Sequence, residues 1–400
     1  MSDPQPQTMP SSSKGNRAAE RQSWWMNLRR VNLRSYTMLF ALAIIAIFFQ
    51  IATDGTFLSP RNFSILIRQM SLIGILTIGM VLLIISGNID LSVGAIAALT
   101  GGIAAVMQVW YGFSTPVSVL IGLLVGIVLG VWQGFWVAYQ KVPSFIVTLG
   151  GMIMFRGIYL TITDGVTITP LAKSFTVLAQ GFAPQILGTT LAVISGVLFT
   201  AGMIRSRASK KKYGIKTDSL VNMIVKIVLG WGLILGVVWW MNRYLGIPIP
   251  VIILIVLALV FTFIATKTEF GRNLYAIGGN MEAARFSGIN EKRTTMMMFI
   301  IMGVLSAVTG VLLAARLDGA TASAGTNLEL DAIAACVIGG ASLSGGQGSI
   351  FFALVGALVM ASLDNGMSLM NTSSYFQFIV KGLVLILAVW FDVWTSQKNK

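Results

Sequence analysis

A few polar side chains interrupt the long apolar stretches of this chain, and they are the residues able to bind a solute or carry a proton. They bear carboxylate, guanidinium, ammonium and amide groups, which are the partners that sugar hydroxyls and protons require. A charged group costs at least ~2.5–3.5 kcal/mol at the centre of a bilayer, so its presence there indicates a function. We therefore expect a translocation path to be lined by Asn88, Asp90, Gln133, Arg156 and Asp331.

The same charged residues also have a structural interpretation, in which they hold the helices together. Asp90 would cap the span that it precedes. Arg156 and Lys381 would pair with acids, or extend along apolar surface toward the membrane interface. The sequence alone leaves both interpretations open.

The residue types that catalysis needs are scarce. The chain contains no histidine, which removes the most common general base and metal ligand together. Its single cysteine, Cys336, excludes a disulfide framework and a thiolate metal cluster. We expect no catalytic, metal-binding or cofactor-binding residue, because an intramembrane enzyme would lack a nucleophile–base pair.

The elements that position these residues follow from the composition, which is that of a membrane protein. Hydrophobic residues make up 56% of the 400 residues and charged residues only 10%, with a mean hydropathy of +0.82. An ordinary soluble domain has roughly 25% charged residues. The 42 glycines suit the close helix packing of membrane bundles.

Apolar stretches of about 20 residues recur along the chain with short polar breaks between them. Because open backbone cannot lie in lipid, we expect an all-α, polytopic membrane helix bundle of about 12 spans. The membrane region is predicted at 33–394, between a disordered N-terminal tail, 1–32, and a short C-terminal tail, 395–400. The predicted spans are 33–52, 64–86, 92–110, 116–139, 144–163, 186–204, 219–241, 250–266, 295–315, 328–345, 349–367 and 376–394.

The positions of the basic residues predict the orientation of the chain. Most of the 28 Lys and Arg residues lie in the N-terminal tail or in loops on its side, above all 205–216 and 267–294. The positive-inside rule therefore places both termini in the cytoplasm. A nucleic-acid partner is not expected despite the net charge of +14, because no basic groove with interleaved aromatic residues is present. The opposite loops hold only Arg61, Lys173, Arg243 and Arg316.

Two glycine-rich segments echo each other. Residues 87–94 and 339–346 share the pattern G-x-x-x-L-S-x-G, and each follows one apolar run and precedes another. Paired segments of this kind in the two halves of a transporter commonly mark discontinuous helices along the path. The alternative is a chance likeness between two glycine-rich turns.

The loop at 267–294, on the tail's side, contains the makings of a short helix. Asn280 can cap its start, and Glu282 in the first turn suits the positive end of the helix dipole. Gly288 can adopt the left-handed conformation past its end, with Ile289 as the apolar residue that follows. A capped helix outside the lipid could dock into a partner protein. An ordinary loop with one helical turn, or an amphipathic interfacial helix, would look similar.

This loop resembles the coupling loop of ATP-binding-cassette importer permeases, whose pattern is E-A-A-x-x-x-G. Glu282, Ala283, Ala284 and Gly288 occupy the matching positions. The wider run 278–290 is similar to the sugar branch of the family, the ribose, arabinose and xylose permeases, and so are 89–94, 143–149 and 330–340. The extra spans joined by basic residues at 186–241, and 362–367, resemble the xylose permeases. The likeness covers almost all of 35–394.

The resemblance implies a division of labour between this chain and its partners. It implies a double-cassette ATPase that binds ATP, a periplasmic sugar-binding protein, a second copy of this chain, and a bacterial inner membrane. The binding protein would dock on the loops 54–63, 164–185 and 316–327. The residues expected to couple this chain to the ATPase are Gly279, Asn280, Glu282, Ala283, Ala284, Arg285 and Gly288.

The pentapeptide 343–347, Leu-Ser-Gly-Gly-Gln, spells the nucleotide-contacting signature of the cassette ATPases themselves. That signature works with a phosphate-binding G-x-x-x-x-G-K-[ST] loop, and this sequence contains none. The pentapeptide is therefore predicted to be a tight turn between two spans, and this chain is not expected to bind ATP.

The function expected from the sequence is the channel subunit of an ATP-driven importer for a monosaccharide, D-xylose in particular. A permease for another monosaccharide or an autoinducer is an alternative within the same family. A proton–sugar symporter is a second alternative, in which Asp90 and Asp331 would carry protons and 278–290 would have no special role.

Overall fold

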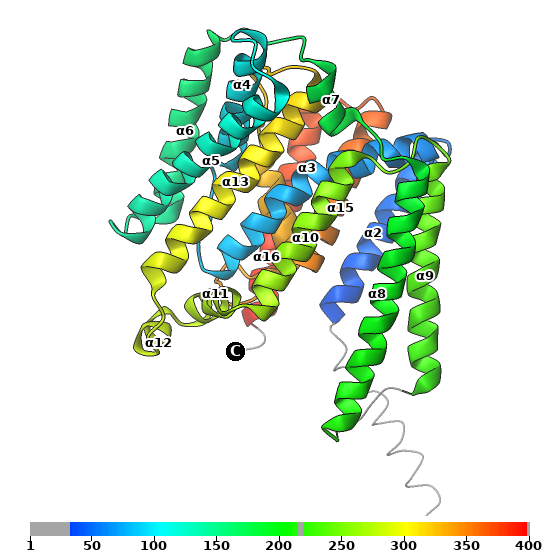
Figure 1. Ribbon diagram of the computed structural model, residues 1–400. Coiled ribbons are helices and arrows are strands. Elements are labelled where there is room, and N and C mark those ends of the chain that lie inside the picture. The colour runs from blue at the N-terminus through cyan, green and yellow to red at the C-terminus, as the bar shows by residue number, and fades with distance from the viewer. Residues whose placement is uncertain (1–32, 215–218, 398–400) are drawn as a thin grey trace, which may run out of the picture.

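The computed structural model describes residues 33–214 and 219–397, and this part of the chain folds into helices joined by short loops (Figure 1). The predicted tail 1–32 and residues 398–400 lie outside the described residues. The helices are α2 (Leu33–Ala52), α3 (Pro60–Ile85), α4 (Val93–Val109), α5 (Thr115–Ala138), α6 (Ser144–Thr163), α7 (Lys173–Gln180), α8 (Gln185–Lys212), α9 (Leu220–Asn242), α10 (Ile249–Lys267), α11 (Glu269–Gly279), α12 (Met281–Phe286), α13 (Glu291–Leu317), α14 (Leu328–Ile338), α15 (Ile350–Leu369) and α16 (Ser374–Gln397).

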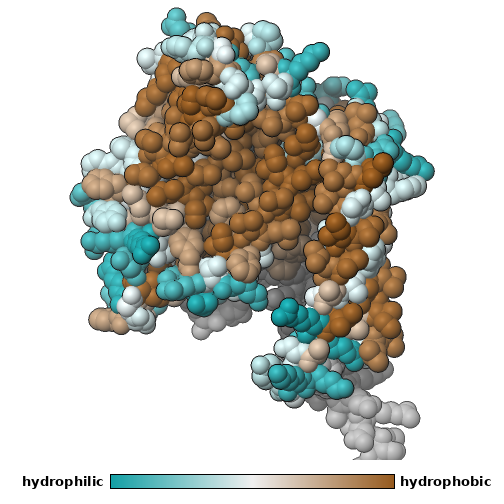
Figure 2. Space-filling view, in the orientation of Figure 1, coloured by the Kyte–Doolittle hydropathy of each residue, from teal (hydrophilic) through white to brown (hydrophobic). Residues whose placement is uncertain are grey.

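The predicted class, a polytopic helical membrane protein, is confirmed. Eight of these helices are long and apolar enough to cross a bilayer, and three shorter apolar helices lie at predicted spans 33–52, 92–110 and 376–394. The broad brown surface in Figure 2 follows from the same composition, because apolar side chains face outward where a soluble protein would be polar.

The prediction of a continuous span at 328–345 is wrong. Helix α14 has only 11 residues and reaches about 16 Å, roughly half the thickness of the hydrocarbon core. The chain is not helical from 339 to 349, where Gly340, Gly345 and Gly346 adopt positive φ angles. These left-handed conformations suit glycine and break the helix, so a short helix is followed by a glycine-rich segment with turns instead of a continuous span.

Helices α3 and α13 form the centre of the bundle. Every residue of α3 from Ser71 onward is buried, and α13 packs closely against α4 and α5 through small residues. A Cβ atom added to Gly101 would lie 2.3 Å from the carbonyl oxygen of Gly310, and one added to Gly126 would lie 2.6 Å from that of Gly303. Such backbone-to-backbone approach explains why these positions are glycine.

Helices α8 and α9 form a hairpin that stands beside the bundle (Figure 1). Only 17% of the apolar window of α8 and 0% of that of α9 are buried, against 78% for α3. The two helices pack on each other where Gly196 contacts the ring of Trp231, whose Nε1 donates to the hydroxyl of Thr200 at 2.9 Å.

Two helices outside the spans were not predicted, α7 and α11. Helix α11 lies in the predicted loop 267–294, and its start at Thr268-Glu269 with apolar residues at 270, 274 and 277 is a helix signal in the sequence. The start of α2 and the end of α16 lie on the same side of the bundle as α11 and α12 (Figure 1). We call this the basic side.

Candidate functional site

Helix α12 has the capped structure that the sequence predicts. The side chain of Asn280 accepts a hydrogen bond from the backbone N–H of Ala283 at 2.9 Å. At the other end Gly288 has φ +81°, its N–H donates to the carbonyl of Arg285, and the N–H of Ile289 donates to that of Ala284. These bonds form a Schellman motif, so the six-residue helix is capped at both ends by its own residues.

The surface of α12 is open to a partner. Ala284 alone among its residues is buried, and Phe286 is 91% exposed with Met281 and Glu282 also exposed beside it. Arg285 forms an ion pair with Glu291 and so ties α12 to the start of α13. An exposed phenylalanine on a small rigid helix is typical of an interface residue.

The seven predicted coupling residues all lie at or beside α12. Gly279 ends α11, Asn280 joins the two helices, Glu282 to Arg285 are within α12, and Gly288 follows its end. The structure therefore brings them into one short segment, as their spacing implies.

Helix α11 connects this segment to the interior of the bundle. A Cβ atom on Gly278 would lie 1.7 Å from the carbonyl oxygen of Ile85 and 2.7 Å from the backbone nitrogen of Gly346. The N–H of Gly346 itself donates to the carbonyl of Ile85 at 2.8 Å. The hydroxyl of Tyr275 donates to the carbonyl of Gly348 at 3.0 Å, and burial raises the pKa of Tyr275, which keeps this donor protonated. We call these five residues the backbone junction.

The backbone junction joins the two echoed segments, because Ile85 and Gly346 adjoin or belong to them. The second segment, including 343–347, is the predicted turn: the N–H of Gly345 donates to the carbonyl of Ser342, and that of Ser342 to the carbonyl of Gln347. Both interruptions of regular helix therefore meet α11 on the basic side.

Two of the predicted path residues, Asp90 and Gln133, lie together in a fully buried network at the start of α4. Oδ1 of Asp90 accepts from the backbone N–H and the hydroxyl of Ser92 at 2.8 and 2.6 Å. Ser92 is itself the N-cap residue of α4, so these bonds close a turn before the helix and do not cap it as predicted. Nε2 of Gln133 donates to the Ser92 hydroxyl. Asn88, two residues before Asp90, is half-buried and donates to the carbonyl of Ser86 at 3.4 Å.

Two acceptor atoms of this network have no hydrogen-bond partner among the described residues. They are Oδ2 of Asp90 and Oε1 of Gln133, and both are buried. Buried acceptors of this kind are costly unless a donor reaches them. The arrangement can hold a small donor, such as water, but it is too closely packed to form a solute path by itself.

Arg156 holds a loop of the opposite side in place. Its guanidinium donates to the carbonyls of Ala322 and Ala324 at 3.0 and 2.7 Å and to the hydroxyl of Thr326 at 3.3 Å. These contacts fix the chain that leads from α13 into α14. The partners are backbone carbonyls and a hydroxyl and not the acid that the structural interpretation expected.

Asp331 belongs to a group of three charges on α14, α15 and α16. Nζ of Lys381 lies 2.9 Å from Oδ2 of Asp331 and 2.8 Å from Oδ2 of Asp364. Asp331 Oδ1 and Asp364 Oδ1 are buried without a partner among the described residues. We call these three residues the charge cluster. Asp364 was missed as a candidate, although a single acid within the apolar run 349–367 is a visible signal.

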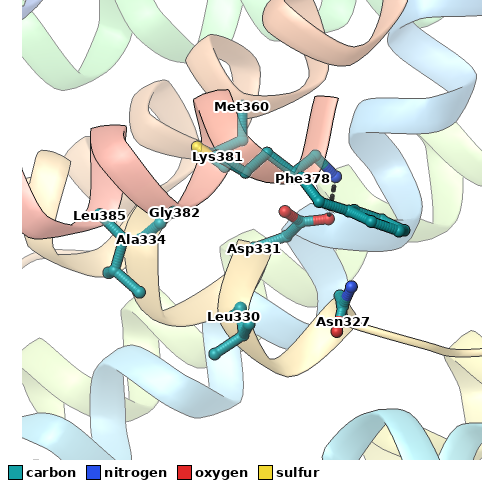
Figure 3. A pocket seen from close by; sticks show the side chains of 9 residues that line it. All are labelled: Asn327, Leu330, Asp331, Ala334, Met360, Phe378, Lys381, Gly382 and Leu385. Carbon is teal, nitrogen blue, oxygen red and sulfur yellow. Dashed lines mark hydrogen bonds and ion pairs between the residues drawn. The ribbon is translucent and has the colours of Figure 1, made fainter. Parts of the chain in front are cut away.

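A cavity of about 110 Å³ adjoins the charge cluster. Figure 3 shows Lys381 and Asp331 pointing toward each other, with the ring of Phe378 beside them and Asn327 below. Phe378 is half exposed, and Asn327 ends the loop that Arg156 holds. Arg156 thus holds the loop 321–327, and Asp331 lies in the first turn of α14, which follows that loop. Asp90 and Gln133 lie together at the start of α4 instead.

Glu329 is a second acidic residue that was missed as a candidate site residue. It is buried at the start of α14, and a Cβ atom on Gly94 of α4 would lie 2.3 Å from its Oε2. It lies in the first turn of α14, two residues before Asp331, inside the predicted span 328–345.

The bundle, its broken crossing and the exposed helix on its basic side define a polytopic membrane transport protein. The profile of the family described as "Branched-chain amino acid transport system / permease component" matches residues 62–389. The chain belongs to this family of permeases, and it is not an enzyme.

Similar proteins are named as permeases, and the similarity extends over most of both chains. The chain is 49% identical to a xylose transport system permease protein of Haemophilus influenzae over 373 residues, 93% of this chain and 99% of the relative. It is 46% identical to the Escherichia coli K12 protein of the same name over 372 residues, 93% and 95% of the two chains. A ribose import permease protein of Bacillus subtilis is 37% identical over 339 residues, 85% and 87%. No solved structure matches the chain.

Proposed function

We propose that this chain is the membrane subunit of an ATP-driven monosaccharide importer and that its solute is D-xylose. The observation that carries the proposal is α12: a capped helix with an exposed apolar residue, joined through α11 to both interruptions of the bundle. The relatives that share 46–49% of its residues are named as xylose permeases, which supports the solute.

The groups beside the cavity can bind a sugar. Asn327, Asp331 and Lys381 offer hydrogen-bond donors and acceptors for hydroxyls, and the ring of Phe378 offers an apolar face. The choice of a sugar over a branched-chain amino acid rests on the similarity to the xylose permeases. We propose that the solute path follows the loop 321–327, between Arg156 and Asp331.

The partners lie on opposite sides of the membrane. The basic side carries most Lys and Arg residues, so we assign it to the cytoplasm, with the chain in a bacterial inner membrane. A double-cassette ATPase would hold ATP and dock on α12, whereas this chain holds none. A periplasmic sugar-binding protein would dock opposite, on 54–63, 164–185 and 316–327. A second copy of the chain would complete the path, surrounded by lipid.

The backbone junction gives this assembly a way to transmit movement. A partner that displaces α12 also displaces α11, because one residue, Asn280, joins them. Gly278 of α11 touches the end of α3 and the turn before α15 through backbone atoms, which cannot rotate away as a side chain can. The crossing that contains α14 would then repack, and access to the cavity would alternate between the two sides.

The test is a charge reversal on α12, Glu282→Lys, with ATP-dependent xylose uptake measured in cells or proteoliposomes that contain the ATPase and the binding protein. We expect uptake to be lost while the chain stays inserted and the ATPase no longer co-purifies with it. Glu269→Lys, the same reversal at an exposed position at the other end of α11, is the matched control and should change uptake by less than about twofold.

Normal uptake in the Glu282→Lys protein would contradict the coupling assignment. Uptake that persists without ATP and stops when the proton gradient collapses would favour the symporter instead. In that case Asp90→Asn should abolish uptake, because the substitution removes the carboxylate oxygen of Asp90, Oδ2, that has no hydrogen-bond partner among the described residues and could take a proton.

A further inference from the structure

Helix α8 is longer than a membrane span, and its final part is strongly basic. Its 28 residues reach about 42 Å, against roughly 30 Å for the hydrocarbon core of a bilayer. The apolar residues end at Ile204, and the helix continues through Lys212 without an acidic residue. We call 205–212 the basic extension; its charges are Arg205, Arg207, Lys210, Lys211 and Lys212.

The helices of the hairpin expose apolar side chains on their outer faces. Large apolar side chains are exposed all along both helices of the hairpin, for example Leu198 on α8 and Leu229 and Leu233 on α9. Figure 2 shows this hairpin as a brown column whose lower end is teal. A helix that is apolar on its outer faces here can only be covered by lipid or by another membrane protein.

The hairpin is fastened to the bundle at the end opposite to the basic extension. There Nε1 of Trp240 donates to the carbonyl of Leu58 at 3.0 Å, and Met241 packs with Phe63 and Ile67 of α3. Figure 1 shows the lower end of α8 well apart from α11 and α12. The basic extension therefore stands away from the helix that we propose for ATPase docking.

The five charges of the basic extension do not form a stripe. Successive residues of a helix are turned by about 100°, so positions 205 and 212 point to one side of the axis and positions 207, 210 and 211 to the opposite side. Four of the five are exposed and Arg207 is half-buried. A protein partner covers one face of a helix, whereas the headgroups of surrounding lipids meet a helix on every side.

We propose that the basic extension binds anionic phospholipid headgroups in the leaflet of the basic side and so anchors the α8–α9 hairpin. The length of α8 places these charges at headgroup depth, just beyond the apolar part. Each basic residue near an anionic surface adds roughly a fivefold preference, so five residues select strongly for negative lipids. The proposal depends on the hairpin lying in the membrane, not on the solute or the ATPase.

The experiment uses the full chain in nanodiscs of one part phosphatidylglycerol to four parts phosphatidylcholine. The protein is then exchanged into detergent, and the lipids that stay bound to it are measured by mass spectrometry. We expect phosphatidylglycerol to be enriched over phosphatidylcholine, and the enrichment to fall at least about fivefold in R205Q/R207Q/K210Q/K211Q/K212Q. It should also fall at high salt, which screens exposed charges.

The matched control keeps the charge and changes the side chains. K210R/K211R/K212R should retain the enrichment of the unchanged protein, because lipid phosphates accept from either cation. Orientation is checked with Tyr213→Cys, at an exposed position beside the extension, since the only native cysteine, Cys336, is buried.

Three results would overturn the proposal. One is equal phosphatidylglycerol enrichment with and without the five charges. A second is that the label on Tyr213→Cys is found on the other side of the membrane when all five charges are substituted. The charges would then set the orientation of the hairpin instead of binding lipid. The third is loss of a co-purifying protein with lipid enrichment unchanged, which would assign the extension to a protein partner.

Discussion

The backbone junction and the charge cluster lie toward opposite ends of the bundle and are held by different forces. In the junction Gly278 meets Ile85 and Gly346 through backbone atoms, and the single side-chain bond is that of Tyr275. In the cluster one ammonium, that of Lys381, lies between two carboxylates on two other helices. One contact is fixed in shape, and the other can rearrange by turning side chains.

This difference suits the two ends to different tasks. A backbone contact carries a displacement from α11 to the neighbouring segments without loss, since neither partner has a rotamer to change. An ion pair between side chains can open when a helix moves and close again afterward. A transporter needs the first property where the push arrives and the second where a solute enters or leaves. The following changes test this contrast, from the largest expected effect to the smallest.

Removing the ammonium of the charge cluster should have the largest effect. Lys381→Met leaves the buried carboxylate of Asp331 and the half-buried one of Asp364 without their cation, and breaking a buried pair in this way costs about 3–5 kcal/mol of unfolding free energy. Denaturant unfolding of the purified chain measures it. Lys381→Arg, which keeps the charge, should lose far less. A Lys381→Met protein as stable as the unchanged chain would show that the cluster does not hold α14, α15 and α16 together.

Adding one methyl group to the backbone junction should come next. Gly278→Ala places a Cβ atom against the carbonyl of Ile85, and overpacking of this kind costs about 1–3 kcal/mol. ATP-dependent uptake should fall more than stability does, because the displaced backbone is the proposed route of coupling. Gly150→Ala in α6 is the matched control, since nothing lies within 4 Å of its added Cβ and it lies outside the coupling segment. Equal uptake by the two variants would show that the backbone junction does not transmit the movement of α12.

Removing the one side-chain bond of the junction should have the smallest effect. Tyr275→Phe deletes a hydrogen bond to Gly348 and should lower the unfolding free energy by about 1 kcal/mol, with coupling largely kept. Tyr111→Phe, at an exposed position, serves as the reference substitution. A loss of uptake in Tyr275→Phe as large as in Gly278→Ala would mean that the side chain, not the backbone, carries the movement.

Features that depend on neighbouring residues could be predicted from the sequence. The spans follow from runs of about 20 apolar residues, and α12 follows from Asn280, Gly288 and Ile289, whose hydrogen bonds join residues at most five apart. The turn at 343–347 follows from its glycines in the same way. The failure at 328–345 has a related cause, because hydropathy reports that a segment lies in the membrane and not that it is helical throughout.

Features that depend on the meeting of distant segments could not be predicted. Asp331 and Lys381 were both visible as intramembrane charges, yet only the packing of α14 against α16 makes them a pair, and Asp364 enters from a third helix. The sequence likewise shows a glycine at 278 without showing what approaches it. Hydropathy and helix capping depend on residues close together in the sequence. The partners of a buried charge or a close-packed glycine depend instead on how whole helices pack. That is why the sequence determined the membrane fold and the capped helix α12, and only the tertiary structure decided the backbone junction, the charge cluster and the separate position of the hairpin.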